Sequence, residues 1–195
     1  MLFLQLFTRL YKIMAEERMM LNKYAMRFGT AMGLFWIFKF IFFALGPNYP
    51  FFFVIFPLLT LAVPFLGYYY IHTYRNKICG GFISFSHAWS FTFLLYSYAA
   101  LLTAVAHYVY FHFIGTDSLM LYYTNQMINP LLSSGNAEQI ALGKQLNEII
   151  KTFQEANLPA IQITMHFITQ NIFYCSLLSI PTALIARKSD TQSYQ

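Results

Sequence analysis

One lysine and two histidines lie deep inside segments that are otherwise apolar. Lys39, His107 and His166 fall in three different predicted membrane spans. Ionisable groups inside a bilayer are costly, so they are functional candidates by default. By helical rise, all three lie ~9 to 10 Å inside the same end of their spans. Gln170 shares a helix face with His166, four residues away. The spacing predicts one polar cluster in the outer half of a helix bundle.

Three kinds of chemistry would suit such a cluster: a haem held by the two histidines, a divalent metal, or a pocket for an anionic head group or quinone. Two histidines alone are not specific for haem, and no carboxylate or cysteine accompanies them as a metal ligand. Lys39 can also extend its ammonium toward the membrane surface. We favour a hydrogen-bonded cluster that fixes helix packing and expect neither a cofactor nor a metal.

Two further patterns concern helix packing. Small residues at Ala25, Gly29 and Gly33 allow another helix to approach closely. Packing against a span of the same chain is favoured, and a homodimer seam stays open. Pro57 and Pro64, seven residues apart, share one face of the second span, and each removes a backbone hydrogen bond. We expect a kink that neighbouring helices satisfy, rather than a gap that binds an ion.

Familiar catalytic motifs do not occur in the sequence. No predicted span contains Asp or Glu, whereas many proton-coupled carriers need a carboxylate there. The metalloprotease H-E-x-x-H, the hydrolase G-x-S-x-G, a glycine-rich phosphate loop and Cys-x-x-Cys are all missing. The cysteines, Cys79 and Cys175, are too few for a disulfide framework. These features favour a protein that is not an enzyme.

Four long apolar blocks must position these residues. Charged residues make up only 10% of the 195 residues, whereas a soluble domain typically carries about 25%. Each block is long enough to cross a bilayer as a helix. The sequence therefore predicts an all-α polytopic membrane protein, one domain over residues 24–188, with four transmembrane helices at about 24–45, 50–71, 87–114 and 160–186.

The segment between the third and fourth spans, residues 115–158, is the only large piece outside the spans. Asn136 is a plausible N-cap for a helix in its second half. Apolar residues recur there at helical spacing, namely Leu142, Leu146, Ile149, Ile150 and Phe153. With a break near residues 130–135, we expect an extracytoplasmic helical hairpin at the membrane surface. Its stripe needs a partner, through residues 119–155: lipid, its own bundle or another protein.

Lysine and arginine gather on one side of the predicted spans. Residues 1–23, the loop at 72–86 and the end of the fourth span carry most of the 12 basic residues. By the positive-inside rule this side is the cytoplasm, so residues 1–23 and the tail at 189–195 are cytoplasmic. The net charge of +5 then reflects orientation in the membrane, and no nucleic-acid partner is expected.

The inner loop resembles a known family. Residues 74–77 (YRNK), 80–85 (GGFISF) and Ala88 are similar to the bacterial membrane family catalogued as domain of unknown function 4199. The start of the first span at 28–33, the outer segment ending at Pro159 and the basic stop after the fourth span extend the resemblance over about 24–188. The chain departs from it at His87 and Trp89 and by a longer amino end. The resemblance implies a four-span bacterial inner-membrane protein and brings no catalytic residues.

These patterns rank three functions. The first is a non-enzymatic bundle that binds a partner or lipid through its outer segment. The alternative is a small channel or carrier that uses the proline-bent second span and the region of Lys39, His107 and His166. The third is a redox or lipid-modifying membrane enzyme. The lipid bilayer is an expected partner in every case, and a homo-oligomer stays open.

Overall fold

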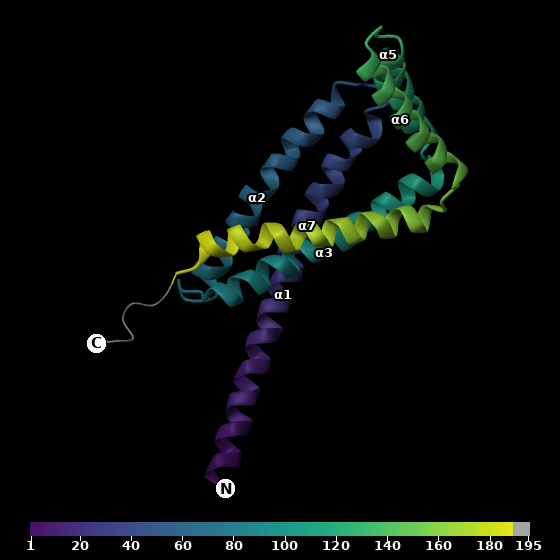
Figure 1. Cartoon of the computed structure of the whole chain (residues 1–195). Coiled ribbons are helices and arrows are strands. Elements are labelled where there is room, and N and C mark those ends of the chain that lie inside the picture. The colour runs from purple at the N-terminus through teal and green to yellow at the C-terminus, as the bar shows by residue number, and fades with distance from the viewer. Residues whose placement is uncertain (189–195) are drawn as a thin grey trace.

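The structure, a computed structural model, describes residues 1–188, and the predicted tail at 189–195 lies outside them. The described residues are helical and form no β-strand, although Ile83 and Lys188 make one isolated antiparallel bridge. Four of their helices are long and apolar enough to cross a membrane (Figure 1). These are α1 (Leu2–Leu45), α2 (Phe52–Lys77), α3 (Phe85–Phe113) and α7 (Ala160–Ala186). The predicted all-α class and the number of candidate spans are confirmed.

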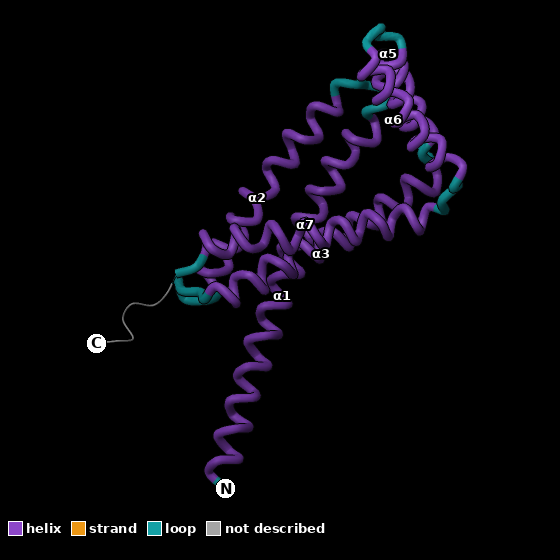
Figure 2. The backbone as a smooth tube through the Cα atoms, viewed as in Figure 1, coloured by secondary structure: helices purple, strands orange, loops and turns teal. Residues whose placement is uncertain are grey.

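The four long helices form two antiparallel pairs that cross each other. α1 and α2 are joined by a short turn at residues 46–51, and α3 runs side by side with α7 (Figure 1). α3 also packs along α1, so it is the central helix and carries much of the core. The loops between successive helices are short (Figure 2). α3 and α7 are connected by the outer segment, which is itself mostly helical.

The small residues of α1 lie against α3 of the same chain. Ala25 is fully buried. A Cβ atom added at Gly29 would lie 2.7 Å from the Leu95 carbonyl oxygen and 2.7 Å from Tyr98 Cβ. At Gly33 it would lie 3.2 Å from Ala99 Cα. The absence of side chains at the two glycines is therefore what lets α1 and α3 come this close.

α1 begins well before the predicted first span. It is continuous from Leu2, and its first turns project beyond the other helices (Figure 1). No glycine or proline occurs before Gly29, so nothing in the local sequence stops the helix between the basic segment and the span. Residues 1–23 are thus a helical extension of the first span.

α2 runs as one helix through both prolines. Pro57 and Pro64 lie within Phe52–Lys77 without interrupting the helix. Each removes the N–H that would bond the carbonyl four residues earlier, at Phe53 and Thr60. Pro64 lines an apolar cavity of about 400 Å³ that it shares with Pro181 of α7. The predicted kink stays a prediction, and the helix around it is intact.

The outer segment consists of two helical arms. The first contains α4 (Asp117–Tyr123), the π-helical η1 (Thr124–Ile128) and α5 (Asn129–Leu132), and the second is α6 (Ala137–Glu155). Asn136 caps α6, because its Oδ1 accepts a hydrogen bond from the Glu138 N–H at 2.9 Å. Gly143 lets α6 lie close to the side chains of Leu131 and Leu132. α4 meets the α1–α2 turn region, with the rings of Tyr122 and Phe53 4.8 Å apart.

Candidate functional site

A small cavity among all four long helices brings together three of the four residues predicted to cluster. It has a volume of about 240 Å³ and is lined by Lys39 of α1, His107 of α3 and Gln170 of α7. His166 lines a neighbouring cavity instead, but its Nε2 lies 3.0 Å from Gln170 Nε2. The ring of Phe167 lines both cavities and contacts both histidines. The predicted cluster is therefore divided by one aromatic side chain.

The Lys39 ammonium lies between α1 and α2. Its Nζ donates a hydrogen bond to Thr60 Oγ1 at 3.2 Å. It also lies 5.2 Å from the ring centroid of Trp36 and 5.3 Å from that of Phe56, within the range of cation–π attraction. Trp36 is almost one turn farther from the outer end of α1 than Lys39. The lysine side chain therefore does not run outward along its helix.

Two buried polar atoms at this cavity have no hydrogen-bond partner within the described residues. They are Trp36 Nε1 and His107 Nδ1, and both residues line the cavity. Leaving such a group unpaired costs ~1–3 kcal/mol. The His107 ring packs against Phe40, with centroids 4.4 Å apart, so aromatic contacts hold it in place. Two residues with an unpaired nitrogen and one lysine thus line the same small cavity.

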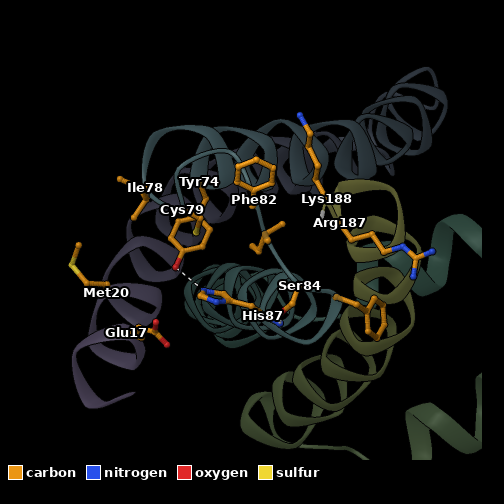
Figure 3. Close-up of a pocket in the computed structure, with 12 residues that line it drawn as sticks. Glu17, Met20, Tyr74, Ile78, Cys79, Phe82, Ser84, His87, Arg187 and Lys188 are labelled. Atoms are coloured by element: carbon orange, nitrogen blue, oxygen red, sulfur yellow. Dashed lines mark hydrogen bonds between the residues drawn. The ribbon is translucent and has the colours of Figure 1, made fainter. Parts of the chain in front are cut away.

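A larger cavity of about 1050 Å³ lies at the end of the bundle that carries most of the basic residues, called here the basic end (Figure 3). Sequence reasoning did not predict it. Tyr74 Oη and His87 Nε2 lie 3.0 Å apart in its wall, and Glu17 and Arg187 contribute opposite charges. Its residues come from α1, the end of α2, the α2–α3 loop, the start of α3 and the two residues after α7, which are distant in sequence. No local sequence pattern predicts such a site.

Cys79 is the one thiol of this basic-end cavity. Burial raises the pKa of the Cys79 thiol, while a hydrogen bond with Tyr74 opposes that shift and the charge of Glu17 adds to it. A thiol is reactive as its thiolate, which needs a lowered pKa. The raised pKa of Cys79 is thus the opposite of the shift that activates a thiol as a nucleophile.

The family-like loop forms a clasp between α2, α3 and α7. Gly80 and Gly81 have φ angles of +66° and +94°, a conformation that glycine adopts without strain. They turn the chain so that Ile83 and Lys188 exchange two backbone hydrogen bonds, at 3.0 and 3.1 Å. Arg75 Nη1 donates a third to the Ala186 carbonyl at 2.8 Å. The glycine pair thus serves to fasten the end of α7.

A third cavity lies beneath the outer segment, where α3 ends and α7 begins. It has a volume of about 600 Å³ and is mostly apolar. α4 and α6 supply Leu119, Met120 and Phe153, and α7 supplies Gln162 and His166. The outer segment thus forms a roof over the ends of two long helices. Its polar lining is limited to a few side chains on one side.

Together these features define an all-helical protein with four membrane-length apolar helices and cavities at three depths. Residues 27–188 match the family described as Protein of unknown function (DUF4199). The chain belongs to this family, as the inner loop and span pattern indicated. No curated protein and no solved structure matches the chain. The family description assigns no activity, so a function must be argued from the cavities.

Proposed function

We propose that this protein is a multi-pass membrane protein that binds a lipid through its outer helical segment. The observation that supports this most is the apolar cavity of about 600 Å³ under that segment. Ligand pockets typically have volumes of ~300–1,000 Å³ and an apolar lining with few polar groups. Size and lining therefore suit one acyl chain that carries a polar group.

The apolar stripe of α6 divides between the chain itself and the surroundings. Phe153 packs against the cluster of Phe40, Tyr110 and Phe111 in the bundle. Leu142 and Ile149 are 47% and 64% exposed. The bundle therefore covers only one side of the apolar stripe, and the other side needs a different partner. The other side fits a segment that rests on lipid, since exposed apolar helix faces are stable at a membrane surface.

Selectivity at this cavity depends on its polar side. Gln162 and His166 are exposed on α7, a helix that we place in the bilayer, so the cavity opens toward lipid. Bilayer tails are as apolar as the cavity wall. The hydrophobic effect alone therefore does not favour an acyl chain in the cavity over the same chain in the bilayer. Hydrogen bonds from Thr116, Gln162 and His166 to a lipid polar group would supply the preference.

Filling this cavity is expected to reduce lipid binding. In Met120→Trp a larger ring occupies the space between α4 and α7, so we expect at least a fivefold loss of lipid that co-purifies with the protein. Native mass spectrometry of protein released from mild detergent measures the bound lipid. Lys151→Trp adds the same ring at an exposed position on the polar face of α6, away from the apolar stripe, and should leave binding unchanged. Equal lipid content in all three proteins would reject the proposal.

A small carrier is a second candidate, supported by the cavity that Lys39, His107 and Gln170 share. The positive charge of Lys39 favours an anionic solute. Such a solute would have to pass the stacked rings of Trp36 and Tyr96, whose centroids lie 6.4 Å apart. Proteoliposomes with the wild-type protein should then take up labelled propionate several-fold faster than those with Lys39→Met. Equal uptake would reject the carrier.

A further inference from the structure

We infer that the cavity of about 240 Å³ among the four long helices is a binding site for a small monocarboxylate anion. The inference names the solute class for the second proposed function and rests on the same cavity. It concerns binding, which does not require that the ion cross the membrane. Charge, unpaired donors and size each contribute to it.

Within the described residues, no carboxylate pairs with the charge of Lys39. Residues 18–116 and 156–188, which hold the membrane-spanning parts of all four helices, contain no Asp or Glu. The ammonium donates to the neutral hydroxyl of Thr60 and lies over two aromatic rings. Lys39 is half-buried, and a charge within a bilayer is stabilised by an ionic partner. An anion in the adjacent cavity would supply one.

The unpaired nitrogens at the cavity suit the same ligand. Trp36 is 7% exposed and His107 is 6% exposed, and neither Nε1 of the one nor Nδ1 of the other has a partner within the described chain. An indole nitrogen can only donate a hydrogen bond, and so can an ammonium. His107 Nδ1 donates in one of its two neutral tautomers. A carboxylate has the acceptor oxygens that groups of these three kinds require, whereas a cation has none.

Size and wall chemistry narrow the anion to a short carboxylate. A cavity needs ~10–15 Å³ to hold one water, so a volume of about 240 Å³ leaves room for an anion of several heavy atoms. One lysine balances one negative charge. The remaining walls include the rings of Phe40, Phe43 and Phe56, which favour an apolar body beside the carboxylate. Propionate combines these properties, and propionamide is its neutral counterpart of nearly equal shape.

The fluorescence of Trp36 reports binding directly. The chain has two tryptophans, so Trp89→Phe leaves Trp36 as the sole emitter. Sodium propionate is titrated into this protein in nanodiscs, with sodium sulfate holding the ionic strength constant. We expect a saturable change with propionate and none with propionamide. Lys39→Met should weaken propionate binding at least tenfold. Lys144→Met removes an exposed positive charge of the outer segment and should leave the affinity unchanged.

Two further measurements make every outcome decisive. Melting temperatures of the variants show whether Lys39→Met is folded, and His107→Phe, which keeps a ring at its place, should also weaken binding several-fold. A response to propionamide equal to that for propionate, or full affinity in folded Lys39→Met, would overturn the inference. Propionate binding without uptake into proteoliposomes would support the site and reject only the carrier. If neither occurs, both are rejected.

Discussion

Replacing Gly29 with valine is expected to prevent the four long helices from assembling. An added Cβ would lie 2.7 Å from the Leu95 carbonyl oxygen, which is backbone of the central helix α3 and cannot move alone. Overpacking a core typically costs ~1–3 kcal/mol, and a branched side chain against backbone falls at or above the top of that range. The melting temperature and the monodisperse fraction of purified protein measure the loss.

Ala31→Val is the matched control for Gly29→Val. Ala31 lies two residues farther along α1 and is exposed, so the same side chain there should leave the melting temperature within a few degrees of wild type. A different outcome for Gly29→Val would identify a homodimer seam. In that case the variant would keep the wild-type melting temperature and lose crosslinks between copies of the chain.

A membrane-impermeant maleimide is expected to label a cysteine at position 136 in intact cells and to spare one at position 86. Asn136 lies at the tip of the outer segment, and Ser86 lies at the basic end; both are exposed. Because basic residues are retained on the cytoplasmic side, the two positions should face different compartments. The contrast is all or none and is read as labelled protein on a gel.

The labelling experiment needs a background without the native thiols, supplied by Cys79→Ser and Cys175→Ala. Cells opened with detergent should label both introduced cysteines equally, which controls for their reactivity. Labelling of both positions in intact cells would place the outer segment and the basic end on one side. That result would overturn the proposed topology and the lipid function with it.

The length of the apolar blocks was enough to predict the four long helices. It was less successful in predicting where each helix ends. Bilayer thickness fixes how much apolar helix is needed, so the core of each span was found. It does not fix where a helix stops, which depends on breakers and tertiary contacts. α2 continues from residue 71 to Lys77, and α1 reaches back to Leu2. In both regions the sequence offers no breaker.

The prediction of the candidate cluster was incomplete for a related reason. Helical rise gives the depth of a residue but not the direction of its side chain, so it could not show that Phe167 lies between the cavity of Lys39 and His107 and the cavity of His166. Trp36 was missed, although its spacing of three from Lys39 puts both on one helix face. The basic-end cavity depends on the pairing of Ile83 with Lys188, which no local pattern predicts.

The length of α1 sets how anything joined to its amino end is presented. Its 44 residues extend ~66 Å at ~1.5 Å per residue, about twice the ~30 Å hydrocarbon thickness of a bilayer. A fluorescent reporter fused ahead of Leu2 would therefore be carried on a rod and not on a tether. The distance of the reporter from the lipid surface would follow from helix geometry. Energy transfer to a dye in the membrane would then report a narrow distribution of distances.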